Sequence, residues 1–196
     1  MAIKPILFNT EMVRAILDGR KTCTRRLVRF LPGENPQWAG YIRDGLMLYN
    51  GKNEPCIRKA PYQPGDILYV RETWCKNPNY DEYYFRTRES GIAPYGLKWH
   101  ASIHMPKEAA RIWLKVTDVR VERLQEIAET GIRKEGVDVD PKECAGKFDF
   151  TSELFFLFQR LWDSTIKKSD IDRYGWDANP WVWVISFERC EKPKGV

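Results

Sequence analysis

The segment WVWVISF, at residues 181–187, alternates its side chains strictly in the manner of a β-strand. Successive residues of a strand point to opposite faces of a sheet, so the two tryptophans share one face and the two valines share the other. A second segment, ILYVRETW at residues 67–74, is apolar on both faces, which is typical of a strand inside a buried sheet. The chain therefore contains a buried sheet, and the charged residues within the second segment, Arg71 and Glu72, need partners there.

Strands and helices follow one another irregularly, and this limits the fold class. Three more strands are predicted at residues 21–30, 97–105 and 110–124, and helices are predicted at residues 9–18, 124–136 and 151–166. We expect Gly131 to interrupt the middle helix and Gly136 to end it. Repeated βαβ units would place a helix after every strand, which this order does not do. We therefore expect an α+β fold: a mixed β-barrel of about five to seven strands with two or three helices packed outside.

The length of 196 residues predicts a single domain. Two stretches, near residues 31–60 and 76–96, look like insertions because the first is rich in Pro, Gly and Asn and the second is polar and rich in Tyr. The first contains Asp44-Gly45 between two short apolar segments, which is a hairpin signal. A second hairpin is predicted around EYYFRTR, residues 82–88. The oligomeric state is not determined by these patterns.

Composition excludes several classes of protein. No apolar run approaches the roughly 20 residues of a membrane helix, and we expect a cytoplasmic protein without a membrane partner. The five cysteines are scattered and contain no CxxC pair, which argues against a disulfide framework and a zinc ribbon. His100 and His104 are four residues apart, but their segment alternates like a strand and contains no HExxH motif. No glycine-rich phosphate loop is present, so we expect no metal and no organic cofactor.

The segment GRKTCTRR, residues 19–26, has four basic side chains and no acid. Residues 1–30 contain seven lysines or arginines and two acids, so they account for the whole formal net charge of +5. Such a local basic patch suits an anionic or electron-rich partner and is too small for a protein that coats nucleic acid. Two interpretations follow: a strip that holds a phosphate backbone, or a group in which Lys21 and Thr24 perform chemistry.

Several segments occur in an order that resembles a known family. These are ILDGRKTCTRR, YQPGDILYVRETW, KVTDVRVERLQEI leading into GIRKEG, and the closing WVWVISFE. The chain is similar to the ASCH domain of the PUA-like superfamily, most of all to its larger bacterial and phage-encoded versions. The similarity covers most of the chain outside the two insertions. It implies a PUA-like β-barrel with a cleft near the first helix.

The resemblance also implies candidate functions and residues. ASCH domains were proposed to bind RNA, and some members are similar to small amidohydrolases that remove the acyl group from N4-acetylcytidine. By that similarity, Lys21 of the GxKT motif is the proton acceptor and Thr24 is the nucleophile. A Glu after the third conserved strand is the proton donor, and the matching position is Glu135, with Glu129 as the alternative. The implied substrate is a small nucleoside or nucleobase.

The chemistry of amide hydrolysis agrees with these residue types. A Thr hydroxyl is a weak nucleophile unless a base takes its proton, and a Lys can do so when burial or nearby cations lower its pKa. Arg26, or a backbone N–H of the turn at Gly19, could stabilise the oxyanion. In a regular strand, Lys21 and Thr24 would point to opposite faces. Their cooperation requires that regular strand begins near Thr22 or later, and we predict their side-chain ends within hydrogen-bond reach or one water apart.

The remaining candidates each have two interpretations. Arg71 and Glu72 either form a structural ion pair or line the cleft and orient a ligand. Trp74 and Trp176 either belong to the core or stack on a base. Asn179, before Pro180, is either a turn residue or a ligand contact. Lys21, Thr24 and Glu135 also have structural readings: a phosphate-contacting lysine, a strand residue and a solvated helix end.

Two other functions use the same basic cleft. One is a non-catalytic RNA-binding module, and the other is an enzyme that cleaves RNA. Binding along an RNA strand requires phosphate contacts spread over a positive surface. A hydrolase of nucleosides requires a closed pocket with one basic end. The chain beyond residue 30 is neutral overall, which favours the hydrolase.

Overall fold

The protein is described by a computed structural model that covers residues 1–30, 38–42, 45–50, 52–55, 60–88, 93–139 and 150–195. It divides into two compact units, each assembled from separate stretches of the chain. Unit 1 comprises Met1–Thr22, Pro64–Thr117 and Phe187–Val196, and unit 2 comprises Cys23–Gln63 and Asp118–Ser186. The two long strands β8 and β9 each begin in one unit and end in the other.

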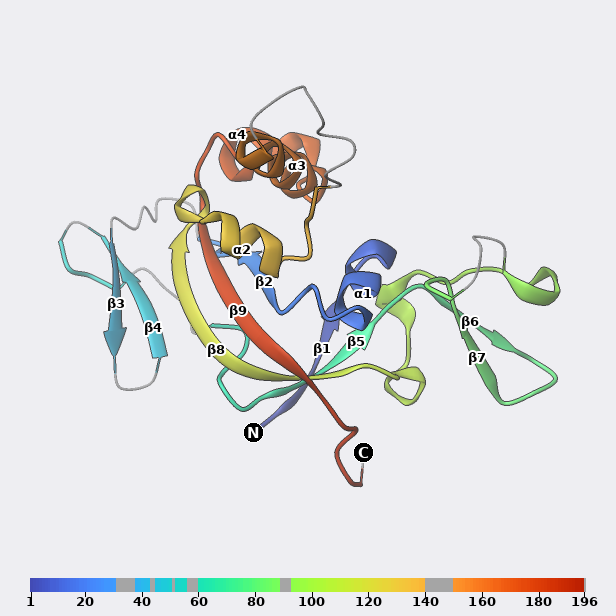
Figure 1. The fold of residues 1–196 in the computed structure, drawn as a ribbon. Helices are drawn as coiled ribbons and strands as arrows, with labels where there is room; N and C mark the ends of the chain where they lie inside the picture. The colour runs from blue at the N-terminus through green and yellow to red at the C-terminus, as the bar shows by residue number, and fades with distance from the viewer. Residues whose placement is uncertain are drawn as a thin grey trace. The chain divides into compact units, whose positions relative to one another are not determined.

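The largest sheet has five strands in the order β1-β5-β8-β9-β2 (Figure 1). β1 and β5 are parallel, whereas β5 with β8 and β2 with β9 are antiparallel, so the sheet is mixed. The described residues also form four α-helices, three of them with at least six residues. The predicted α+β class is therefore confirmed. The five strands are β1 (Ile3–Leu7), β2 (Cys23–Leu27), β5 (Ile67–Arg71), β8 (Trp113–Arg123) and β9 (Trp181–Cys190).

Unit 1 contains the predicted buried strand. β5 lies between β1 and β8, and four of its five residues are buried. Its core includes Ile67, Tyr69, Met105 and Trp113. The segment therefore reads as apolar on both faces because both faces are covered.

The first helix, α1 (Thr10–Leu17), begins and ends as its sequence predicts. The Asn9 side chain accepts a hydrogen bond of 2.9 Å from the backbone N–H of Met12, which satisfies one of the free donors of the first turn. Gly19 follows the helix with φ +76°, a left-handed conformation that costs a glycine little. The chain then enters β2, whose regular strand begins at Cys23. A strand start at Thr22 or later is thus confirmed.

The predicted strand at residues 97–105 is wrong. The segment makes one isolated bridge, between His100 and Trp74, and then a 3₁₀ turn, η2 (Ser102–His104). Its backbone bonds locally, since the N–H of His104 donates to Ala101 and the N–H of Met105 donates to Ser102. The alternation did not reflect burial, because Met105 is fully buried whereas Ile103 is 59% exposed.

Unit 2 is built around helix α3 (Phe150–Ser164), whose buried face carries Leu154, Phe158 and Trp162. These side chains pack with Val182 and Val184 of β9 and with Ile132 of α2 (Glu129–Lys134) in one apolar core. Helix α3 begins close to the predicted position and ends two residues early. Helix α2 packs against α3 in this unit (Figure 1). A last short helix, α4 (Ile171–Tyr174), follows the 3₁₀ turn η5 (Lys168–Asp170).

The middle helix begins later than predicted. Residues Leu124–Glu126 form a 3₁₀ turn, η4, and α2 starts at Glu129. A neighbouring loop contacts this turn: the N–H of Leu124 donates to the carbonyl of Pro180, and the N–H of Gln125 donates to the Asn179 side chain. Ile127 and Ala128, between the turn and α2, have extended backbone, so the helix does not continue from the turn. The end at Gly136, which has φ +84°, is as predicted.

Gly131 lies inside α2 and does not interrupt it. A Cβ at this position would lie 3.0 Å from Cγ1 of Ile127 and 3.1 Å from Nη2 of Arg25. A larger residue here would force Ile127 or Arg25 to shift, and the helix tolerates the glycine.

The change Gly131→Ala should lower the free energy of unfolding by roughly 1 kcal/mol, as overpacking does in a filled site. Alanine favours a helix over glycine by about 1 kcal/mol, so the measured loss is what remains after that gain. Urea denaturation is the measurement. The neighbouring change Thr130→Ala is the control, and it should be neutral or slightly stabilising; a gain in stability for Gly131→Ala would contradict the steric argument.

Both predicted hairpins are present. In unit 2, β3 (Trp38–Ile42) pairs antiparallel with β4 (Gly45–Tyr49), and Asp44 of the predicted turn lies outside the described residues. In unit 1, β6 (Trp74–Asn77) pairs antiparallel with β7 (Glu82–Phe85).

Within the part of the chain that is described, no helix is long and apolar enough to cross a bilayer. Two further 3₁₀ turns, η1 (Pro94–Gly96) and η3 (Lys107–Ala109), belong to unit 1.

Candidate functional site

Strand β2 carries the basic segment at the end of the sheet order. Its residues pair with β9 so that Cys23 lies opposite Ser186, Thr24 opposite Ile185 and Arg25 opposite Val184. Alternation along a strand places Cys23 and Arg25 on one face and Thr24 and Arg26 on the other. Arg25 and Arg26 therefore lie in different surroundings, although they are adjacent in the sequence.

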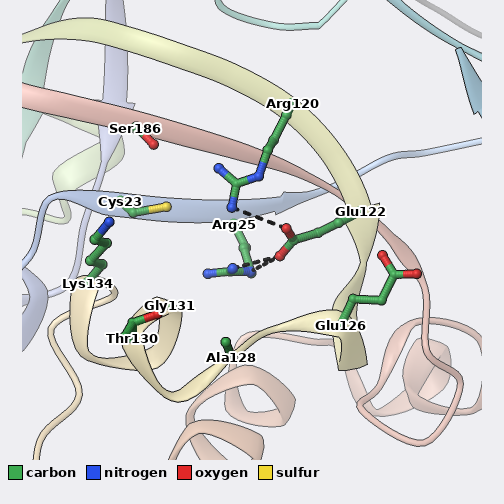
Figure 2. A pocket seen from close by; sticks show the side chains of 10 residues that line it. All are labelled: Cys23, Arg25, Arg120, Glu122, Glu126, Ala128, Thr130, Gly131, Lys134 and Ser186. Atoms are coloured by element: carbon green, nitrogen blue, oxygen red, sulfur yellow. Dashed lines mark hydrogen bonds and ion pairs between the residues drawn. The ribbon is translucent and has the colours of Figure 1, made fainter.

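Arg25 is buried and held by two carboxylates. Its Nε and Nη2 donate to Oε1 of Glu122 at 2.9 and 2.6 Å (Figure 2). Its Nη1 donates to Oε1 of Glu135 at 3.3 Å. Its side chain is 2% exposed, so a single negative charge lost here would leave an uncompensated ion in the interior. Glu122 is shared, because its Oε2 accepts a hydrogen bond of 3.2 Å from Arg120.

Thr24 is bonded to Arg26 on the other face of β2. Nη1 of Arg26 donates to Oγ1 of Thr24 at 3.0 Å and to the backbone carbonyl of Arg25 at 3.2 Å. Thr24 is 1% exposed. A guanidinium that donates to a hydroxyl oxygen favours negative charge on that oxygen, and it leaves the hydroxyl proton directed elsewhere. This arrangement suits a hydroxyl that must lose its proton.

Arg26, which is bonded to Thr24, also interacts electrostatically with Glu135. Burial lowers the pKa of Arg26, while the nearby Glu135 and Tyr62 raise it in part. Burial in turn raises the pKa of the Tyr62 hydroxyl, and the charge of Arg26 opposes that shift. Glu135 thus interacts with both arginines, by a hydrogen bond to Arg25 and through space with Arg26. Thr24, Arg26 and Glu135 form one charged neighbourhood in unit 2, and we call it the Thr24 site.

Lys21 belongs to unit 1. It is 3% exposed, its backbone N–H donates to the carbonyl of Ala15 at 2.9 Å, and its Nζ lies 5.5 Å from the centre of the Phe8 ring. Burial of this kind is unlike that of a solvated phosphate-contacting lysine. The predicted approach of the Lys21 and Thr24 side chains stays a prediction.

Burial distinguishes the two candidate acids. Glu135 is 5% exposed and follows the last residue of α2, where its backbone N–H still bonds to the helix. Glu129 has a side chain that is 41% exposed and forms an i,i+4 ion pair with Arg133 at 3.0 Å. The surroundings of Glu135 therefore suit a role in a site, and those of Glu129 suit a surface ion pair.

Arg71 and Glu72 have different partners in unit 1. Glu72 is 1% exposed, and its two oxygens accept hydrogen bonds of 2.9 and 3.0 Å from Arg111 and of 2.8 Å from Thr87. Nη1 of Arg71 donates to the carbonyl of Ile103 at 3.1 Å, and its buried Nε has no partner among the described residues. The expectation of a partner for Glu72 is met by Arg111, so an ion pair between Arg71 and Glu72 is not what neutralises it.

Trp74 is already packed between rings. Its ring centre lies 5.7 Å from that of Tyr83 and 5.1 Å from that of His100. Its indole N–H is buried without an acceptor in the part of unit 1 that is described. Stacking on a base stays a prediction for this residue, and it would require one of these rings to move.

Trp176 packs against the core of unit 2 and meets Phe158 edge-on, with ring centres 5.9 Å apart. Asn179 has φ +45°, and its side-chain oxygen accepts a hydrogen bond of 2.9 Å from the N–H of Gln125. Its carbonyl accepts a second bond, of 3.2 Å, from Arg123. Both residues therefore have structural contacts within unit 2. Contact with a ligand stays a prediction for each.

The contacts of Asn179 should contribute to the free energy of unfolding. Asn179→Ala should lower the free energy of unfolding by about 1–2 kcal/mol, because alanine loses the bond to Gln125 and tolerates the left-handed conformation less well. Asn179→Gly should cost less, since glycine keeps that conformation and loses only the hydrogen bond. Chemical denaturation of both variants is the measurement, and equal losses would show that the backbone conformation contributes nothing.

Three residues of these networks were not singled out from the sequence. Glu122 and Arg111 stand in strand-like runs of mixed charge, and only the fold shows that they face buried partners. Tyr62 lies beside the first insertion. A buried arginine must have acceptors, which is the one signal that could have prompted a search for Glu122.

No group of three His, Cys, Asp or Glu side chains that could hold a metal ion occurs in the described residues. His100 and His104 belong to an irregular segment, where the ring of His100 packs on Trp74. Cys23 and Cys75 are buried, and Cys190 is partly exposed.

Comparison with known proteins gives two solved structures. One is the hypothetical protein PH0355, with 15% sequence identity and a TM-score of 0.36, covering 97% of this chain and all of that one. The other is an ASCH domain from Lactobacillus crispatus JV V101, with 12% identity and a TM-score of 0.39, covering 96% of this chain and 79% of that one. At TM-scores below 0.5, neither likeness supports a statement about this chain. No family model and no curated protein sequence matches the chain.

Proposed function

We propose that the chain is an ASCH-type amidohydrolase of the PUA-like superfamily that removes the acyl group from N4-acylcytosine nucleosides such as N4-acetylcytidine. The proposal combines the motif resemblance with one observation. The Thr24 hydroxyl is buried and accepts a hydrogen bond from Arg26, next to the carboxylate of Glu135. The five cysteines, scattered and without a paired framework, suit a cytoplasmic location for the enzyme.

The proposed reaction assigns one task to each residue. Lys21, three residues before Thr24 in the chain, takes the hydroxyl proton, and Oγ1 of Thr24 attacks the acyl carbonyl. The bond between the carbonyl carbon and the cytosine N4 atom breaks, and Glu135 donates a proton to the leaving amine. Water then attacks the acyl ester and gives a proton to Glu135, and Lys21 returns its proton to Oγ1 of Thr24, so that both groups regain their starting state. Arg26, already bonded to Oγ1, is placed to stabilise negative charge that develops near this oxygen.

The residues placed as ligand contacts have less support. Arg71, Glu72 and Trp74 lie in unit 1, and Trp176 and Asn179 lie in unit 2 with structural partners of their own. Their proposed role in holding the nucleoside rests on the motif resemblance. The reaction as proposed uses only groups of the chain and water.

The basic segment has few side chains left for phosphate. Of the seven basic residues in the first thirty, Lys4, Arg14, Arg20 and Arg25 are ion-paired, and Lys21 is buried. A strip that tracks an RNA backbone needs exposed cations in succession. Pairing and burial therefore favour the hydrolase over the RNA-binding module and the RNA-cleaving enzyme that share its cleft.

The experiment is an assay of the purified chain with N4-acetylcytidine, in which release of cytidine is followed by chromatography. We expect turnover without added metal or cofactor. Binding to a single-stranded RNA is measured in parallel. No cytidine release, together with tight and salt-dependent RNA binding, would reject the hydrolase in favour of the RNA-binding module.

A further inference from the structure

Unit 2 contains a pocket that the proposed reaction does not use. Its volume is about 180 Å³, and it is lined by residues of β2, β8, β9 and α2 and by the turn before α2 (Figure 2). Thr24, Arg26 and Glu135 are not among its lining residues. It lies on the face of β2 that carries Cys23 and Arg25, whereas Thr24 is on the other face. A ligand here would be separate from the substrate of the Thr24 site.

Arg25 is the buried polar group of this pocket. Three of its N–H groups have acceptors, two through Oε1 of Glu122 and one through Glu135. A guanidinium has five N–H groups, so two of them have no acceptor among the described residues. A side chain that is 2% exposed cannot satisfy such donors freely with bulk water. Because Arg25 lines the pocket, a ligand bound there could accept hydrogen bonds from these two N–H groups.

The carboxylates of the lining are engaged, whereas one cation is not. Glu122 bonds both Arg25 and Arg120, and Oε2 of Glu126 accepts the backbone N–H of Arg123 at 3.0 Å. Lys134 has no ion-pair or hydrogen-bond partner in the described parts of the chain, and its side chain extends along the pocket in Figure 2. Three cations (Arg25, Arg120 and Lys134) and two carboxylates (Glu122 and Glu126) line the pocket, so its lining has a formal excess of one positive charge.

Two hydroxyl groups add donors to the same space. Thr130 of α2 and Ser186 of β9 line the pocket, and within the described residues neither hydroxyl has a hydrogen-bond partner. Gly131 lies between Thr130 and the guanidinium, where a Cβ would come within 3.1 Å of Nη2 of Arg25. The pocket is smaller than the roughly 300–1,000 Å³ that drug-sized ligands occupy. Its occupant must therefore be small and rich in acceptors.

We propose that this pocket binds a small oxyanion, either inorganic phosphate or a short carboxylate. The free N–H groups of Arg25, the ammonium of Lys134 and the hydroxyls of Thr130 and Ser186 are its donors. Glu126, on the far side of Arg25 from Lys134 in Figure 2, sets the end of the site that an anion avoids. The pocket takes no part in the reaction proposed at Thr24, although Arg25 also donates a hydrogen bond to Glu135.

The test is an NMR titration of the full chain, labelled with ¹⁵N, with sodium phosphate and separately with sodium acetate at constant ionic strength. The signals to follow are the side-chain Nε–H of Arg25 and the backbone N–H of Gly131. We expect saturable shifts at both with at least one of the two anions, and the anion that saturates identifies the ligand class. Lys134→Gln should weaken this binding about tenfold, because a charge-assisted hydrogen bond is lost.

Lys167→Gln is the matched control, since Lys167 is an exposed lysine of unit 2 outside the pocket, and it should leave the affinity unchanged. Linear shifts with both anions would overturn the proposal, and so would equal losses of affinity in the two lysine variants. The readout is binding alone. A chain that fails to release cytidine can therefore still show this site, and an active enzyme can lack it.

Discussion

Replacing Thr24 by valine should reduce the release of cytidine from N4-acetylcytidine at least about a thousand-fold, the scale seen when a nucleophile is removed. Valine has nearly the shape of threonine, so the buried position stays filled. Nη1 of Arg26 loses one acceptor but keeps the carbonyl of Arg25 at 3.2 Å. We therefore expect a cost of only about 1 kcal/mol in the free energy of unfolding. Steady-state assays and chemical denaturation of the same preparation measure both quantities.

Two further substitutions separate chemistry from packing. Thr24→Ser keeps the hydroxyl and should retain much of the activity lost by Thr24→Val. Thr22→Val changes an exposed threonine two residues away and should leave the rate unaltered. Lys21→Ala should be as inactive as Thr24→Val if Lys21 is the base, because removing either partner of a nucleophile and its base costs about as much as removing both. Full activity of Thr24→Val would reject Thr24 as the nucleophile and, with it, the proposed mechanism.

The elements that could be predicted are those whose pattern reports burial directly. β5 and β9 are apolar on both faces because other elements cover both faces, and α3 carries its apolar stripe toward the core of unit 2. The cap at Asn9 and the helix ends at Gly19 and Gly136 depend on local chemistry alone. Such features do not require knowledge of a distant partner, so the sequence is sufficient.

The elements that were missed depend on contacts between segments far apart in the chain. The 3₁₀ turn at residues 124–126 is held by two hydrogen bonds to the loop at residues 179–180, far away in the sequence. The alternation at residues 97–105 resembled that of a strand, yet the segment turns so that Met105 enters the core of unit 1. Propensity is overridden in both places by tertiary hydrogen bonds and burial.

The Thr24 site illustrates the same limit. The motif selected Lys21, Thr24 and Glu135, and the need to stabilise an oxyanion added Arg26. The structure brings Thr24, Arg26 and Glu135 together in unit 2, whereas Lys21 belongs to unit 1. The motif did not indicate that Arg25 belongs to a different face with Glu122, because charge alone does not report direction. Adjacent arginines in a strand have opposite surroundings, and only the pairing of β2 with β9 shows which is which.

The largest effect on stability is expected from Arg25→Met. Methionine fills much of the space of the arginine stem but leaves the carboxylates of Glu122 and Glu135 without their buried cation. Removing one partner of a buried ion pair typically costs 3–5 kcal/mol. Glu122 keeps Arg120, and Glu135 keeps the nearby charge of Arg26, so we expect a loss of about 3 kcal/mol, at the lower end of that range. The free energy of unfolding in urea is the measurement.

The surface offers a matched control for that loss. Arg14→Met removes an arginine whose i,i+3 pair with Glu11 is exposed, and it should cost no more than about 0.5 kcal/mol. Adding Glu122→Gln to Arg25→Met should recover part of the stability, since the amide removes one uncompensated charge, and the two changes would then be clearly non-additive. Additive losses, or a loss as small as that of Arg14→Met, would show that Arg25 does not neutralise these carboxylates. The physical reason for the outcome is general: charges at the surface are solvated when their partner is removed, whereas the carboxylates that hold the buried Arg25 lose a cation where solvation is weaker.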